Sequence, residues 1–96
     1  MKPSLRLEEN REAIRRAAER NRTANPRVFG SVLRGEDREN SDLDILVDDL
    51  PGATFFDICG LQGELRDLLG IRVDVLTPGD LPEKWRDRVL AEAIPV

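Results

Sequence analysis

The sequence contains no histidine and no tyrosine, and its single cysteine is Cys59. Without histidine the chain cannot build a Ser–His–Asp triad, a histidine metal site or a histidine acid–base catalyst. Without a second cysteine it cannot form an internal disulfide, which fits a reducing compartment. Any acid–base or metal chemistry must therefore rest on carboxylates, lysines, Cys59 or hydroxyl groups.

Long hydrophobic runs and an excess of positive charge are missing as well. No segment approaches the roughly 20 apolar residues of a membrane span, and the charged beginning of the chain has no apolar signal region. We therefore expect a cytoplasmic protein that does not enter membranes. The formal net charge of −4 argues against strong non-specific binding of nucleic acid, because such binding depends on the neutralisation of phosphates by basic residues.

Ninety-six residues, 40% of them apolar and 35% charged, predict one globular domain over residues 1–96. Hydrophobic periodicity predicts helices over residues 4–22 and 55–69, strands over residues 27–29, 42–48 and 71–76, and a last helix after residue 80. Ser4 is the expected N-cap of the first helix and Asn25-Pro26 its end. Asp80 and Glu83 are spaced as the capping pair of the last helix.

The helix over residues 55–69 has the clearest local signals. Thr54 is its expected cap, and Gly70 stands where a helix commonly ends. Its predicted apolar face consists of Phe55, Ile58, Leu61, Leu65, Leu68 and Leu69.

The element order α-β-β-α-β-α predicts an α/β fold with a small mixed three-stranded sheet flanked by helices. A short connection makes the first two strands antiparallel, and the helix that follows permits a parallel crossover to the third.

Three aspartates are predicted to converge on one face of this sheet. Asp42 and Asp44 point to the same side of the second strand, while the apolar residues between and after them point into the core. Asp74 joins them if the third strand lies beside the second. Two carboxylates about 6 Å apart repel by about 3 kcal/mol at an effective dielectric constant near 20. A divalent cation would offset that repulsion, and oxygen ligands without histidine or cysteine favour Mg²⁺ or Mn²⁺.

Gly30-Ser31 offers a site for phosphate at the end of the first strand. Glycine lets the backbone approach a ligand closely, and the N–H groups that follow can bind an anion together with the Ser31 hydroxyl. If the first two strands are antiparallel, Gly30-Ser31 lies beside Asp42 and Asp44. The residues suited to phosphate and those suited to metal are then adjacent.

This arrangement resembles the DNA polymerase β-like nucleotidyltransferase superfamily. Residues 28–35, VFGSVLRG, and 41–47, SDLDILV, are similar to the motifs of its minimal branch, the MNT domains, and the resemblance covers nearly the whole chain. It implies that Asp42 and Asp44 bind metal ions. It also implies that Asp74 completes a second metal site and helps to activate the acceptor hydroxyl.

The resemblance also implies a nucleotide and a partner. Gly30, Ser31 and Arg34 would contact the triphosphate of ATP; Val32 stands where many members carry a basic residue, and Arg34 could partly replace that contact. Many stand-alone MNT proteins are antitoxins paired with a HEPN-family ribonuclease toxin, and some add AMP to a tyrosine of the toxin. A Mg²⁺-dependent protein adenylyltransferase acting on a HEPN toxin is thus the expected function.

Two other functions stay open. The chain could be an antitoxin that neutralises its toxin by contact alone, or a transferase acting on an RNA end or a small molecule such as an aminoglycoside. The three intact aspartates favour an active enzyme, because a vestigial site would relieve its repulsion by losing one. The acidic charge and the lack of a second domain disfavour the third function.

Each motif also has a purely structural interpretation. Asp42 and Asp44 could lie on a solvated strand face, Asp74 could pair with Arg72 or another arginine, and Gly30-Ser31 could be an ordinary turn. Trp85 is expected to anchor the last helix, either to the core or to a partner.

Overall fold

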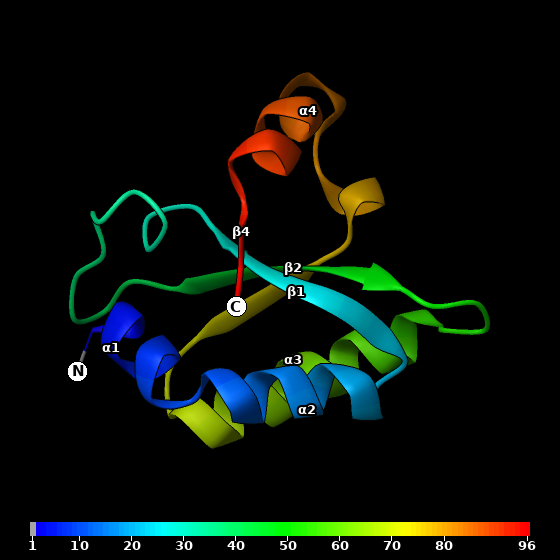
Figure 1. The fold of residues 1–96 in the computed structure, drawn as a ribbon, viewed down its shortest axis with the longest axis horizontal. Coiled ribbons are helices and arrows are strands. Elements are labelled where there is room, and N and C mark those ends of the chain that lie inside the picture. The colour runs from blue at the N-terminus through cyan, green and yellow to red at the C-terminus, as the bar shows by residue number, and fades with distance from the viewer. Residues whose placement is uncertain (1) are drawn as a thin grey trace.

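The computed structural model describes residues 2–96 as one α/β unit (Figure 1). Its elements are α1 (Pro3–Glu9), α2 (Arg11–Arg20), β1 (Thr23–Phe29), β2 (Leu43–Asp49), α3 (Phe55–Leu69), β3 (Val73–Leu76), the 3-10 turn η1 (Pro78–Asp80), α4 (Glu83–Glu92) and β4 (Ile94–Pro95). Helices α2 and α3 cover one face of the sheet, and α4 stands on the opposite side (Figure 1). No helix within residues 2–96 has the length and apolar character needed to cross a membrane.

The sheet is mixed, as the sequence predicts. Its strand order is β3-β2-β1-β4; β1 pairs with β2 in antiparallel orientation, and β2 pairs with β3 in parallel. The two-residue strand β4 adds a fourth member at the β1 edge. Two residues are too few to show an alternating pattern, so the sequence predicted only three strands.

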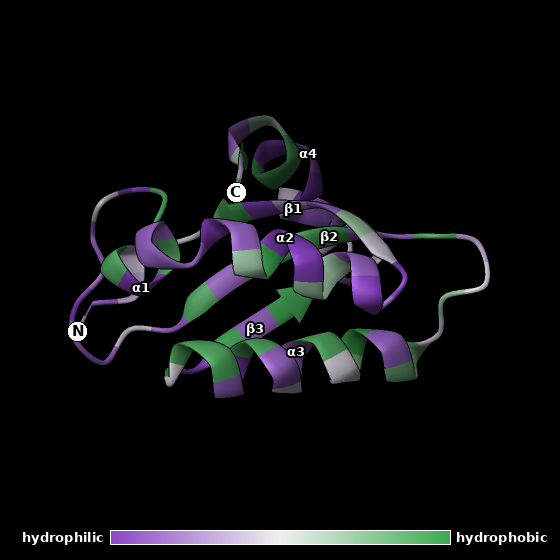
Figure 2. Cartoon of the chain, turned by 60° about the horizontal axis from the view of Figure 1, so that its bottom comes forward, coloured by the Kyte–Doolittle hydropathy of each residue, from purple (hydrophilic) through white to green (hydrophobic). Residues whose placement is uncertain are grey.

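Alternation along the strands separates the core from the candidate site. Leu43, Ile45 and Val47 of β2 are fully buried, and they join a core that includes α2 and α3 residues. Figure 2 shows the same alternation along β3, where hydrophobic and hydrophilic positions follow one another. Asp44 and Asp74 therefore project from the face that α2 and α3 do not cover.

The N-terminal helix differs from the prediction in its continuity and its cap. The backbone breaks at Asn10 (φ −129°, ψ 19°), which divides the expected single helix into α1 and α2. Ser4 is not the cap; its N–H donates to Oδ2 of Asp37 at 3.0 Å. A cap supplied by a residue 33 positions away leaves no local signal in the sequence.

The first strand begins earlier than expected, and Asn25-Pro26 does not end a helix. Helix α2 ends at Arg20, and a bulge between Ala24 and Arg27 lies within the pairing of β1 with β2. Asn25 takes the left-handed conformation there (φ 54°), which asparagine tolerates better than most residues. The bulge admits Pro26 to the strand.

Helix α3 has the predicted bounds but a narrower buried face. Thr54 and Asp57 form a capping box, and Gly70 ends the helix with φ 66°. Ile58, Leu61, Leu65 and Leu69 are buried, as expected. Phe55 and Leu68 are not, with exposed fractions of 76% and 41%, because the sheet is too small to cover the whole stripe.

The last helix is also placed differently. Asp80 caps η1 instead of α4, accepting hydrogen bonds from the N–H and the hydroxyl of Thr77 at 3.0 Å each. Helix α4 has no buried residue among its ten described positions. Arg86 ties it to η1 by donating to the carbonyl oxygens of Pro78 and Leu81. Trp85 is 54% exposed, so of the two expected anchors, the core and a partner, the core is excluded.

Candidate active site

Asp44 lies at the centre of the candidate site because it belongs to the middle of three paired strands. Phe29 is its register partner on β1, and Asp74 is its register partner on β3. The parallel pairing of β2 with β3 thus places two aspartates side by side on the uncovered face. Asp42 directly precedes β2, which begins at Leu43 rather than at residue 42 as expected.

Gly30 packs against the carboxylate of Asp44. A Cβ atom added at residue 30 would overlap Oδ2 of Asp44, and the backbone there has φ 78°. Both conditions favour glycine, since other residues rarely adopt this conformation and any of them would displace the carboxylate. The predicted meeting of the Gly30-Ser31 segment with the strand of Asp44 is therefore present.

The loop after Gly30 is a compact series of hydrogen-bonded turns. The N–H of Arg34 donates to Gly30 O at 3.2 Å, and the N–H of Glu36 donates to Ser31 O at 2.8 Å. Further along, the buried carboxylate of Asp37 accepts the Ser4 N–H and fastens the loop to α1. Ser31 and Arg34 are thus carried on a segment anchored at both ends.

The electrostatics of the site centre on Asp44. Burial, followed by the charges of Asp74 and Asp42, raises the pKa of Asp44 to about 6, and Arg34 acts in the opposite direction. Asp74 is the register partner of Asp44, and Asp42 precedes Asp44 by two residues, so three negative charges belong to this part of the sheet. A divalent cation would favour the charged form and offset the repulsion.

Each outer aspartate faces an arginine. Asp42 lies 3.5 Å from Nε of Arg72, and Asp74 lies 3.4 Å from Nη2 of Arg66. Both pairs are solvent-exposed, and such pairs typically contribute about 0–1 kcal/mol. Each pair thus adds little to the stability of the fold, and the carboxylate oxygen atoms stay accessible to other ligands.

The donor set suits a hard cation, because all three candidate ligands are carboxylates on one exposed face. Within residues 2–96, no group of three or more acidic, cysteine or histidine side chains is gathered into a ready-made metal site. Carboxylates repel one another when no ion is bound, and a bound cation would draw them together. The role of the three aspartates as metal ligands stays a prediction.

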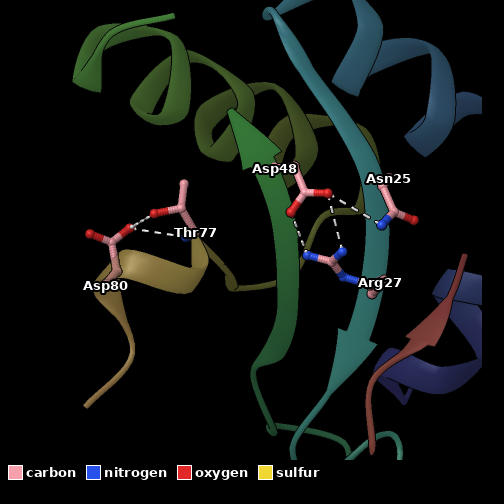
Figure 3. A network of polar contacts seen from close by, with 5 residues as sticks. All are labelled: Asn25, Arg27, Asp48, Thr77 and Asp80. Atoms are coloured by element: carbon pink, nitrogen blue, oxygen red, sulfur yellow. Dashed lines mark hydrogen bonds and ion pairs between the residues drawn. The ribbon is translucent and has the colours of Figure 1, made fainter. Parts of the chain in front are cut away.

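A second polar network occupies the same face, and sequence reasoning missed it. Arg27 binds Asp48 at 2.9 Å, and Asn25 donates to the same carboxylate at 3.3 Å, as Figure 3 shows beside the Thr77–Asp80 cap. The hydrogen bond from Arg27 is the main cause that lowers the pKa of Asp48, and the one from Asn25 adds to it. The signal was present, because Asp48 has the same alternation phase as Asp44.

Comparison with known proteins places this geometry in context. The profile of the family described as nucleotidyltransferase domain matches residues 10–95. A predicted protein adenylyltransferase of Methanocaldococcus jannaschii is 44% identical over 69 residues, which cover 72% of this chain and 74% of that protein. The protein adenylyltransferase MntA of Thermococcus cleftensis is 41% identical over 67 residues, covering 70% of this chain and 68% of MntA.

Two solved structures share the fold. The solved structure of a protein assigned as a minimal nucleotidyltransferase superimposes with a TM-score of 0.84 at 46% identity, covering 94% of this chain and 92% of the other. A chain from the crystal structure of a toxin–antitoxin with AMP-PNP superimposes with a TM-score of 0.75 at 22% identity, covering 90% of this chain and 71% of the other.

Proposed function

Because the chain belongs to the nucleotidyltransferase domain family, we propose that it transfers AMP from ATP to a hydroxyl group of a partner protein. The observation that carries this proposal is the surroundings of Asp44. Gly30 packs against its carboxylate on one side, and Asp74 is its register partner on the other. A loop suited to phosphate and two carboxylates suited to metal thus meet at one point of an exposed face.

The proposed reaction is an in-line displacement at the α-phosphorus of ATP. The acceptor oxygen forms a bond to that phosphorus, the bond to the bridging oxygen breaks, and pyrophosphate leaves. Bound Mg²⁺, or Mn²⁺ in its place, would neutralise the phosphates and the developing charge. We assign Asp42 and Asp44 to the nucleotide-bound ion, and Asp74 to a second ion and to the proton of the acceptor.

The phosphate end of the site would be formed by the loop. The N–H groups after Gly30 and the hydroxyl of Ser31 are suited to bind phosphate oxygens. Arg34 is in the same loop, and its charge lowers the pKa of Asp44, which supports its assignment to the triphosphate. Its exposed ion pair with Glu36, at 3.2 Å, is weak enough to be exchanged for phosphate.

We assign the acceptor to a protein toxin of the HEPN ribonuclease class, and the modified group to a tyrosine hydroxyl. Similarity to protein adenylyltransferases supports a protein acceptor, and the toxin–antitoxin of the same fold indicates where to search for it. The net charge of −4 disfavours non-specific electrostatic binding of RNA. The chain itself has no tyrosine, so a tyrosine acceptor must come from another molecule.

Helix α4 is the proposed docking surface for that protein. It stands on the side of the sheet opposite α2 and α3 (Figure 1). Strand alternation directs Asp44 and Asp74 to that same side. Trp85, Leu90 and Ile94 on α4 and β4 are 54%, 40% and 52% exposed. Apolar side chains beside the site could hold an acceptor in place, a task for which larger transferases use additional domains.

Intact-mass spectrometry of the toxin tests the proposal. After incubation with this protein, ATP and Mg²⁺, the toxin should gain the mass of one or more AMP units and lose ribonuclease activity. The variant with Asp42→Asn and Asp44→Asn should add none. Neutralisation by that variant without added mass would identify a contact-only antitoxin, and labelling of free RNA ends would identify a different acceptor.

A further inference from the structure

Strand β3, which carries Asp74, lies at the edge of the sheet, and two side chains of α3 bind its main chain. Nε of Arg66 donates to the carbonyl oxygen of Val73 at 2.9 Å. The N–H of Val75 donates to Oε1 of Gln62 at 3.0 Å. These two contacts flank Asp74 on both sides along the strand.

Gln62 and Arg66 are four residues apart, so they lie on the same side of α3. Helix α3 is itself fixed by Leu61, Leu65 and Leu69, which are almost completely buried. The two polar side chains therefore extend from a rigid base and clamp three consecutive residues of an edge strand that would otherwise have a free side.

Arg66 makes one more contact, and it is with the carboxylate of Asp74. Its Nη2 lies 3.4 Å from Oδ1 of Asp74 while its Nε holds Val73. Because the guanidinium is planar and rigid, the first bond fixes where the second nitrogen can be. The Asp42–Arg72 pair differs, since the Arg72 side chain is 74% exposed and that of Arg66 is 41% exposed.

We propose that Arg66, supported by Gln62, is a positioning residue that orients the carboxylate of Asp74 for the transfer step. Its charge also offsets part of the repulsion between Asp74 and Asp44, the pair that the register places side by side. This inference rests on the proposed function, which assigns Asp74 to the acceptor and the second ion. Arg66 acts through Asp74 and touches neither nucleotide nor acceptor.

A purely structural role would have a different signature. If Arg66 only fastened β3 to α3, its loss would lower the melting temperature and leave the transfer rate per folded molecule unchanged. A positioning role lowers kcat for transfer and leaves KM for ATP nearly unchanged, because the nucleotide-bound ion is assigned to Asp42 and Asp44.

The experiment compares Arg66→Gln, Arg66→Lys, Asp74→Asn and the double variant of Arg66→Gln with Asp74→Asn. Arg16→Gln is the matched control, because Arg16 forms an exposed ion pair on α2 with Glu12. We expect Arg66→Gln to lower kcat by about tenfold with KM for ATP within about threefold of the parent, the scale of a misplaced catalytic group. Arg66→Lys keeps the charge but cannot make both contacts, so its kcat should lie between those of Arg66→Gln and the parent.

The double variant decides whether Arg66 acts through Asp74. Asp74→Asn should lower transfer by about a hundredfold or more, and adding Arg66→Gln should lower it by less than about twofold further, because coupled residues are not additive. A further tenfold loss would overturn the inference. Normal turnover by Asp74→Asn would instead refute the role that the proposed function gives to Asp74.

Titration with Mn²⁺ in the presence of AMP-PNP, followed by the melting temperature, gives a readout that needs no turnover. Arg66→Lys keeps the positive charge but loses the two-point contact, so it should raise the Mn²⁺ concentration required for half of the stabilisation by about threefold or more when Asp74 is present. It should leave that concentration unchanged when residue 74 is asparagine. An equal effect in both backgrounds, or none in either, would also overturn the inference.

Discussion

Gly30 and Asp44 are in contact across two antiparallel strands, and the carboxylate of Asp44 occupies the space in which any other residue 30 would place its Cβ atom. The fit joins the end of the phosphate-binding loop to the central carboxylate of the site. A side chain at residue 30 would displace this carboxylate.

Gly30→Ala should therefore affect both the fold and the nucleotide site. The left-handed backbone alone costs about 1 kcal/mol with a Cβ atom, and the overlap with Asp44 should bring the loss to roughly 2–4 kcal/mol. Gly70→Ala is the matched control, since Gly70 has φ 66° and open space around its Cα. Urea unfolding should show a smaller loss for Gly70→Ala, and only Gly30→Ala should abolish stabilisation by ATP with Mg²⁺. Equal unfolding losses would show that the overlap is relieved without cost.

The raised pKa of Asp44 predicts how the metal-free protein responds to pH. Its value of about 6, against 3.8 for an ordinary aspartate, means that the folded state binds the proton more tightly than the unfolded state. Stability from this group is present below pH 4 and is lost as the pH rises from about 4 to 6. Asp44 is half-buried, so solvent screening limits the loss to the order of 1–2 kcal/mol.

The difference in unfolding free energy between the parent and Asp44→Asn isolates this effect. Asp37 and Asp48 have lowered pKa values, so they change the stability of both proteins in the opposite direction and cancel. In EDTA, the unfolding free energy of Asp44→Asn should rise relative to that of the parent between pH 4 and pH 6. A difference that stays constant over this range would show that Asp44 titrates normally.

The metal and nucleotide assignment predicts a thermal shift. At 100 times its dissociation constant, ATP with Mg²⁺ should stabilise the fold by about 2.7 kcal/mol and raise the melting temperature by about 10 °C. Asp42→Asn combined with Asp44→Asn should abolish the rise. Asp49→Asn combined with Asp67→Asn makes the same change of charge at exposed positions and should keep it. An unchanged rise in the first variant would remove these two aspartates from the site.

Local signals predicted the bounds of α3, and strand alternation predicted that Asp44 and Asp74 lie side by side. Thr54, the apolar spacing and Gly70 define the helix within one stretch of chain. The adjacency of Asp44 and Asp74 follows from alternation in two strands joined by a helical crossover. The family resemblance added the roles of these residues, which periodicity alone cannot supply.

Contacts between distant segments could not be predicted in the same way. Asp37 caps α1 from 33 residues away. Arg66 is eight residues from Asp74, but their contact depends on how α3 lies against the edge of the sheet. Phe55 fits the helical stripe yet is 76% exposed, because periodicity shows which side of a helix is apolar and does not show how far the sheet extends beneath it. For the same reason, periodicity left open whether Trp85 packs on the core or on a partner, and its 54% exposure excludes the core.

The exposure of Trp85 leads to a prediction about the partner. Because its side chain is 54% exposed on a helix with no buried residue among positions 83–92, Trp85→Ala should change the unfolding free energy by less than about 1 kcal/mol. If α4 docks the acceptor protein, the same substitution should raise KM for the toxin by about tenfold or more, since aromatic side chains dominate such interfaces. KM for ATP should stay the same.

Phe56→Ala is the control, because Phe56 is 84% exposed at the beginning of α3, on an element that covers the other face of the sheet. Steady-state transfer to the toxin at varied toxin concentration distinguishes the two surfaces. A large effect of Phe56→Ala with none for Trp85→Ala would place the acceptor at α3, and equal effects would show that neither helix alone determines docking.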